Sequence, residues 1–216
     1  DRSIEIEKAK QLDLKYRWNS EHFAIVLNPY YQFVEDFISI TPTDSLQKNT
    51  YRIYNYVQYD EVTMSGIELN LHYHPHVLHN LHIEQSYNFI STNAKTPIGD
   101  YGIAMTPSDK IKTKFILSSV ENDMLSKLKI EDIMLKHTFS FKQDNISFIE
   151  RSTDSYNVID FEIRFKSLLN GLNSAIAINN VLNEEYTPHT SRMRGLGPTG
   201  VPNPGRSFAI SMKYNF

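Results

Sequence analysis

The chain has 216 residues, a formal net charge of −3 and no cysteine. The balanced charge argues against a nucleic-acid binder that relies on a basic field. The lack of cysteine excludes disulfides, thiolate metal sites and a cysteine nucleophile. No apolar run approaches the roughly 20 residues of a membrane helix. A transmembrane β-barrel stays possible, because only every second residue of its strands must be apolar. The chain begins Asp1-Arg2-Ser3-Ile4 without the apolar segment of a signal peptide, so we expect a mature chain or an internal piece.

Apolar and polar residues alternate with a period of two along most of the chain. Residues i and i+2 share one face of a strand, so each such stretch predicts a strand with one apolar and one polar face. The stretches lie near residues 12–18, 23–37, 67–74, 81–89, 110–117, 159–166, 174–179 and 206–216. Only 128–141 is ambiguous, because Lys129, Glu131 and Asp132 break any clean face. The pattern therefore predicts about nine strands and no helix.

The connections between these stretches alternate in length. Short ones lie near residues 19–22, 75–80, 119–126 and 168–173, and long ones near 39–55, 91–109, 142–155 and 182–205. Short turns at one end and long loops at the other are typical of an outer-membrane barrel. Aromatic residues at strand ends and strands of about 9–11 residues point the same way.

The predicted fold class is therefore all-β, an antiparallel up-and-down transmembrane β-barrel. Its apolar faces, with Phe161, Ile163, Phe208 and Ile210, would contact lipid, and its charged faces would line a wet lumen. The alternative is a secreted β-sandwich that binds carbohydrate or another surface ligand. In a sandwich the same apolar side chains would be buried against a second layer.

Five of the eight histidines lie between residues 71 and 83. His72 and His74 share a strand face, and neutral imidazole is a common zinc or copper ligand, so both are weak candidates for a metal site. The alternative is a polar turn, because Pro75 interrupts the strand within a short connection.

Two further groups are candidate ligand contacts in the long connections. One is an aromatic run made of Tyr51, Tyr54, Tyr56 and Tyr59, with Arg52 between them. These residues could stack on a ligand or form hydrogen bonds to it, or the tyrosines could be aromatic residues at the top of a strand. The longest loop carries a second group, made of His189, Arg192 and Arg194. This group could bind an anion, or its arginines could pair with a neighbouring loop.

The sequence contains no catalytic or phosphate-binding motif that would indicate an enzyme. Residues 195–200 fit G-x-G-x-x-G in letters, but Pro198 lies inside the motif and Val201-Pro202-Asn203-Pro204 follows it, so we expect no helix N-terminus that could hold a phosphate. No G-x-S-x-G or H-E-x-x-H occurs. We expect neither catalysis nor a cofactor.

Several segments resemble TonB-dependent outer-membrane receptors. The C-terminal ones are Ile178-Asn179-Asn180-Val181-Leu182-Asn183-Glu184-Glu185-Tyr186, then His189-Thr190-Ser191-Arg192, then Pro202-Asn203-Pro204-Gly205-Arg206-Ser207-Phe208, and the terminal Phe216. They follow one another in the order and spacing of the family. Upstream, Asp36-Phe37-Ile38-Ser39-Ile40-Thr41-Pro42-Thr43 and Ser65-Gly66-Ile67-Glu68 are also similar to it.

The resemblance implies a barrel of about 22 strands around an N-terminal plug, of which this chain, residues 1–216, would supply the last nine strands. Nine strands alone would leave two unpaired edges in lipid, so we expect an incomplete barrel. No plug and no TonB box is found in the sequence. The implied function is energy-dependent uptake of a scarce nutrient, such as a metal complex, haem or siderophore, across the outer membrane. The implied partners are outer-membrane lipid, the plug, the remaining strands and, through the plug, TonB.

Overall fold

A computed structural model describes residues 4–47, 51–75, 77–96, 99–120, 122–169, 171–195 and 200–214. For residues 42–47, 51–53, 167–169 and 195 it describes the backbone alone. The terminal aromatic Phe216 and the turn residue His76 lie outside the described residues.

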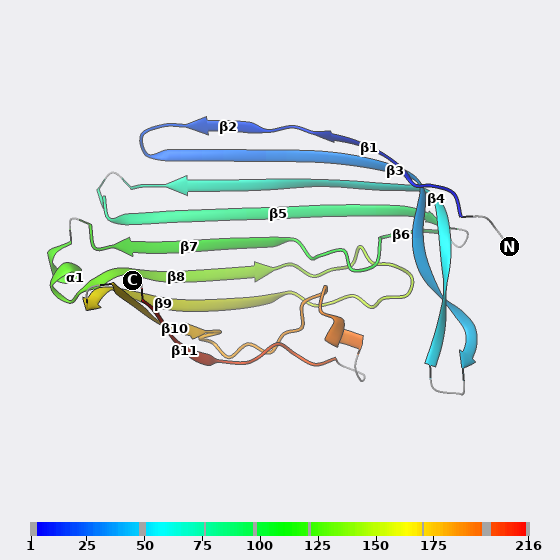
Figure 1. Ribbon diagram of the computed structural model, residues 1–216. Coiled ribbons are helices and arrows are strands. Elements are labelled where there is room, and N and C mark those ends of the chain that lie inside the picture. Colours follow the sequence, from blue (N-terminus) through cyan, green and yellow to red (C-terminus); the bar gives the residue numbers. More distant parts are fainter. Residues whose placement is uncertain are drawn as a thin grey trace.

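The described strands all join one antiparallel sheet (Figure 1). They are β1 (Lys8–Asp13), β2 (Tyr16–Asn19), β3 (Phe23–Gln47), β4 (Tyr51–Tyr73), β5 (Leu81–Thr96), β6 (Gly99–Tyr101), β7 (Lys110–Ser118), β8 (Ile130–Ser140), β9 (Tyr156–Leu169), β10 (Leu172–Asn179) and β11 (Ser207–Tyr214). Their order across the sheet is β1, β3, β4, β5, β7, β8, β9, β10, β11, with β2 also on β3 and β6 on β5. Because β1 and β2 lie on the same edge of β3 and β6 is a short return, nine strands lie side by side, as the alternation predicts.

The break between β1 and β2 has a simple cause in β3. Leu14 donates its backbone N–H to the carbonyl oxygen of Pro29 at 3.0 Å. Both backbone groups of a residue in an antiparallel strand point to the same side, and proline has no N–H to return the bond. The ladder therefore stops at Leu14 and Lys15 and resumes at β2.

The structure corrects two expectations about the connections. The predicted long connection at 39–55 is mostly strand, because the β3–β4 pairing continues from Phe37↔Tyr59 to Gln47↔Tyr51. It runs past the last pair of β4 with β5, Val62↔Ala94, as a hairpin that bends away from the sheet (Figure 1).

Two short helical segments also occur where none is predicted, α1 (Asp123–Lys127) and the 3-10 turn η1 (Arg192–Gly195). The Asn122 side chain caps α1 by accepting a hydrogen bond from the N–H of Leu125 at 3.1 Å. Segments of four or five residues are too short to show a helical period. The ambiguous stretch 128–141 contains β8.

The two faces of the sheet differ as the alternation predicts. Directly opposite residues share a face, and one apolar row crosses five strands, made of Phe115, Leu135, Phe161, Ile178 and Phe208. Phe208 is 74% exposed and Ile210 is 70% exposed. Among the described residues, no second layer covers this apolar face, so the structure does not support the sandwich alternative.

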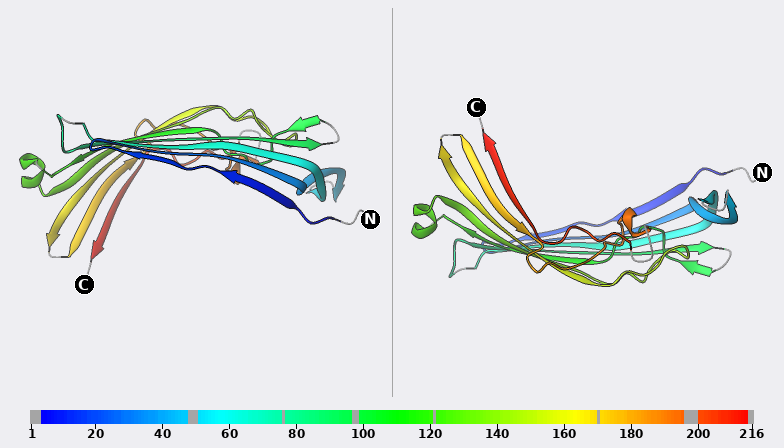
Figure 2. Two further views of the ribbon diagram at one scale, coloured as in Figure 1. Left: turned by 90° about the horizontal axis from the view of Figure 1, so that it is seen from above. Right: turned by 90° about the horizontal axis from the view of Figure 1, so that it is seen from below.

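The row one residue away lies on the opposite face and is charged. It consists of Glu84, Lys114, Lys136 and Asp160, on β5, β7, β8 and β9. Figure 2 shows that the sheet is twisted and open, with β1 and β11 at its two edges. In the part of the chain that the structure describes, no helix is long and apolar enough to cross a membrane.

The small buried core lies at the long-loop end of the charged face. Val34, Val62 and Ala94 are directly opposite one another on β3, β4 and β5 and are almost fully buried. Ile103 and Phe148, from two of the long connections, pack against this cluster. Val62 and Glu68 share a face because they are an even number of residues apart on β4. The long loops therefore fold over the charged face at one end and leave its other end open.

Candidate functional site

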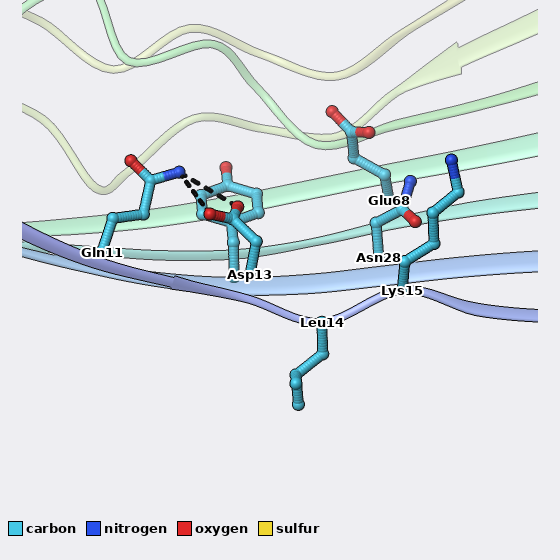
Figure 3. A pocket seen from close by; sticks show the side chains of 7 residues that line it. Gln11, Asp13, Leu14, Lys15, Asn28 and Glu68 are labelled. Atoms are coloured by element: carbon cyan, nitrogen blue, oxygen red, sulfur yellow. Dashed lines mark hydrogen bonds between the residues drawn. The ribbon is translucent and has the colours of Figure 1, made fainter.

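The polar face of the sheet is hollowed at its β1–β3–β4 edge (Figure 3). The Gln11 amide donates to both carboxylate oxygens of Asp13, at 3.0 Å and 2.8 Å. Glu68 and Lys15 point to the same side, whereas Leu14 points to the opposite side of the sheet (Figure 3). The mixed charges indicate a wet surface and do not select one ligand charge.

Charges along the middle of the polar face pair across strands. Lys114 Nζ lies 3.0 Å from Glu84 Oε2, and Lys136 Nζ lies 2.7 Å from Asp160 Oδ2. Arg164 makes a bidentate pair with Asp132 on β8, with both N···O distances at 2.8 Å. These side chains stabilise the wall by cross-strand pairing, so few of their charges face a ligand alone.

Three histidines gather where β4 ends and β5 begins. One ligand atom from each of His72, His74 and His82 lies within 4.8 Å of the others. The rings of His72 and His74 stack with centroids 4.3 Å apart, and the His82 ring meets that of His74 edge-on at 4.2 Å. Burial and the neighbouring rings of His82, His72 and His22 lower the pKa of His74, which favours the neutral imidazole. Sequence reasoning placed His72 and His74 together and missed His82.

The predicted loop residues His189 and Arg194 meet a glutamate that sequence reasoning missed. Arg194 Nη2 lies 2.9 Å from Glu150 Oε1, and His189 Nε2 lies 3.5 Å from Glu150 Oε2. The other ring nitrogen of His189 lies 3.1 Å from Thr153 Oγ1. His189 is only 2% exposed. The cluster therefore joins the β8–β9 connection to the β10–β11 connection.

Backbone groups complete the surroundings of Glu150. Its Oε1 accepts from the N–H of Met105 at 3.0 Å, and its Oε2 accepts from the N–H of Ser147 at 3.3 Å. Burial alone would raise the pKa of Glu150. The hydrogen bonds from His189 and the two backbone N–H groups outweigh burial and hold the pKa at about 2. Since Met105 precedes β7, one carboxylate ties three long connections together.

The other predicted contacts lie toward the solvent. Tyr54 and Tyr56, on the β3–β4 hairpin, are 50% and 72% exposed. Arg192, at the start of η1, is also exposed. The side chains of Tyr51 and Arg52 lie outside the described residues. The structure thus separates the predicted loop residues into an exposed group and a pair that contacts Glu150, the buried His189 and the partly buried Arg194.

Comparison with known proteins places this architecture in a family. A family model described as "TonB dependent receptor-like, beta-barrel" matches residues 2–181. The chain belongs to the TonB-dependent receptor family. A comparison with curated proteins gives no match.

Solved structures of similar fold agree with the family match. The copper transporter OprC superposes with a TM-score of 0.83 at 16% identity, covering 100% of this chain and 32% of that one. The FrpB iron transporter from Neisseria meningitidis (F3-3 variant) gives a TM-score of 0.71 at 17% identity, covering 97% and 30%. The siderophore receptor PirA from Acinetobacter baumannii gives 0.62 at 13%, covering 97% and 32%. The chain therefore spans about a third of the length of these proteins.

Two of the segments that resemble TonB-dependent receptors have a structural role here. Asn180 has a φ of 52° and Asn183 a φ of 56°, a region that asparagine tolerates better than most residues. The Asn180 side chain bonds both backbone groups of Glu184 at 2.8 Å. Asn183 Oδ1 accepts from the N–H of Arg206 at 2.9 Å, and a Cβ on Gly205 would lie 2.6 Å from that oxygen. These contacts therefore hold the segments 178–186 and 202–208 against each other directly before β11.

Another group of residues that sequence reasoning missed fixes the loops beside the buried core. Asn145 bonds the backbone of Thr92 in both directions, accepting at 3.0 Å and donating at 2.9 Å. Gln143 donates to the carbonyl oxygens of Thr106 and Pro107 at 3.1 Å and 2.9 Å. These contacts join segments that are distant in sequence, so no local sequence pattern predicts them. They leave the long-loop end of the receptor densely hydrogen-bonded.

Proposed function

We propose that residues 1–216 form the C-terminal part of the barrel of an outer-membrane receptor that takes up a scarce nutrient. The observation that carries this proposal is the single two-faced sheet. Phe208 and Ile210 are exposed on its apolar face, and paired charges line the other. In water such a face would drive association, whereas in a bilayer it contacts acyl chains and leaves the charged face to a wet lumen.

The two edges of the sheet support a larger assembly. In the described chain, β1 and β11 each pair on one side only. Unpaired strand edges are not stable within a bilayer, so both edges require further strands. We propose that these come from the rest of the receptor barrel, that a plug fills the lumen, and that TonB acts through the plug. The names of the similar structures support a metal ion, a metal complex or a siderophore as the nutrient class, with haem also possible.

The exposed residues of the β3–β4 hairpin and of the β10–β11 connection would supply the ligand contacts. Tyr54, Tyr56 and Arg192 offer aromatic faces and a guanidinium to solvent. Tyr51 and Arg52 belong to the same hairpin and stay candidates. His189 and Arg194 would act through the Glu150 cluster by holding the loop of Arg192 in place.

Solubility and growth together test the proposal. The protein should fractionate with outer membranes and need detergent for extraction. Deleting its gene should impair growth on one limiting metal or metal-complex source, and the wild-type gene should restore it. Tyr56→Ala should weaken that rescue, whereas Val77→Ala, an exposed change in a short turn, should not. Extraction as a monodisperse monomer in detergent-free buffer would contradict the proposal.

A further inference from the structure

We propose that His72, His74 and His82 form a binding site for a divalent transition-metal ion such as Zn²⁺ or Cu²⁺. The site lies on the polar face at the short-turn end, away from the long connections. This inference goes beyond the proposed uptake function, because the site is separate from the loop residues that would contact the nutrient. Three imidazoles suit zinc, copper or nickel, whereas magnesium and calcium prefer oxygen ligands.

Strand geometry brings the three rings together. His72 lies on β4, and His74 directly follows Tyr73, the last residue of that strand. The N–H of His74 still donates to the carbonyl oxygen of His22 at 2.8 Å, so the chain stays extended and the two side chains point to one face. Tyr73 pairs with Ile83, so in an antiparallel ladder His74 lies opposite His82. The result is a triangle whose ligand atoms all lie within 4.8 Å of one another. In a tetrahedral zinc site with Zn–N of about 2.0–2.1 Å, ligand nitrogens lie about 3.3 Å apart. Rotation of partly exposed rings can supply this contraction.

One nitrogen of the cluster is available for a metal. His72 Nε2 is buried and has no hydrogen-bond partner among the described residues. A buried polar atom without a partner is unfavourable, and a metal ion would satisfy it. The other ring nitrogen, Nδ1, lies 4.0 Å from Glu84 Oε1. This distance is longer than a hydrogen bond. The negative charge of the carboxylate on that side still favours the proton on Nδ1, which leaves the lone pair on Nε2 for a metal.

Glu84 is itself held in place. Lys114 Nζ lies 3.0 Å from its other oxygen, Oε2. The order Lys114, Glu84, His72 therefore forms a chain of contacts that leads to the site from β7. Since a short turn already joins β4 to β5, a metal would close only a small additional loop and would add little stability through chain entropy. A direct binding measurement is the more informative test, because it gives both the stoichiometry and the affinity of the site.

Titration of the purified receptor in detergent with Zn²⁺, by calorimetry, tests the site. The test compares wild type with His74→Gln and with the triple variant H72Q/H74Q/H82Q. The control is His137→Gln, because His137 lies on β8 and contacts Asn157 at 3.0 Å, outside the cluster. The triple variant should lose one zinc equivalent. His74→Gln should weaken that site by at least the roughly 10–100-fold that loss of an outer-shell partner causes. The control should match wild type.

A second measurement guards against misfolding of the variants. Wild-type receptor loaded with Cu²⁺ should give an electron paramagnetic resonance spectrum with coupling to several imidazole nitrogens. Equal zinc stoichiometry and affinity in wild type and the triple variant would overturn the inference, as would coupling to a single nitrogen. A receptor that supports nutrient uptake but shows either result would retain the proposed function and lose this site alone.

Discussion

The two ends of the polar face use the same kinds of side chain in different ways. At the long-loop end, His189 and Arg194 both contact Glu150, and Glu150 also accepts two backbone N–H groups. At the short-turn end, His72 keeps a buried nitrogen without a described partner. His189 and Arg194 at the first end are paired within the structure, whereas His72 at the second end has a ring nitrogen that no described residue pairs. The type of residue alone therefore does not identify a ligand site, because the neighbouring groups determine whether its polar atoms are already paired.

The largest expected effect follows from breaking the cluster at the long-loop end. Glu150→Ala leaves Arg194 and the buried His189 without their carboxylate. Removing one partner of a buried ion pair costs about 3–5 kcal/mol. We expect that loss in the free energy of unfolding, measured by denaturant titration of the protein in lipid vesicles.

The same loop offers a matched control. Asp144 pairs with Lys142 at 3.0 Å, and both side chains are more than half exposed. Exposed pairs contribute about 0–1 kcal/mol, so Asp144→Asn should change stability little. Equal effects of the two substitutions would show that the Glu150 cluster does not hold the loops.

The comparison of the two ends assumes that the polar face has been assigned to the correct side of the sheet, and a substitution at Phe161 tests this assignment. Phe161 lies in the apolar row between Leu135 and Ile178. A lysine at mid-bilayer on the lipid face costs about 2–4 kcal/mol, so Phe161→Lys should impair membrane assembly, measured by heat-modifiable mobility on gels. Asn70→Lys on the polar face, opposite the uncharged Val26 and Ser86, should assemble normally. Normal assembly of Phe161→Lys would reverse the face assignment.

A fall in pH should weaken the Glu150 cluster at the long-loop end without any mutation. The pKa of Glu150 is lowered from 4.5 to about 2 in the folded protein. A lowered folded-state pKa gives stability that is complete above the unfolded value and is lost as pH falls through the folded value. Wild type should therefore lose stability between about pH 4.5 and pH 2, and Glu150→Gln should show less of that slope in the same vesicle titration. Identical slopes would contradict the assigned contacts.

The sheet could be predicted from sequence because its two environments alternate residue by residue. The row from Phe115 to Phe208 is visible as alternation within each strand, without knowledge of the partner strands. The contacts between the connections do not show such an alternation. Glu150 meets Arg194 across 44 residues, and no local period links them. His82 joins His72 and His74 only through the register that pairs Tyr73 with Ile83. Strand faces are local information, whereas register and loop contacts are not.

The smallest expected effect concerns the segment that carries the family resemblance. Asn180 is 3% exposed, and its side chain makes two hydrogen bonds to the backbone of Glu184. Asn180→Ala would leave those groups unpaired and would place alanine at a φ of 52°. We expect a loss of about 1–3 kcal/mol in the free energy of unfolding. Asn179→Ala, one residue earlier and exposed, should change it by no more than about 0.5 kcal/mol. A larger effect at Asn179 than at Asn180 would mean that this segment acts through its surface rather than by fixing the chain before β11.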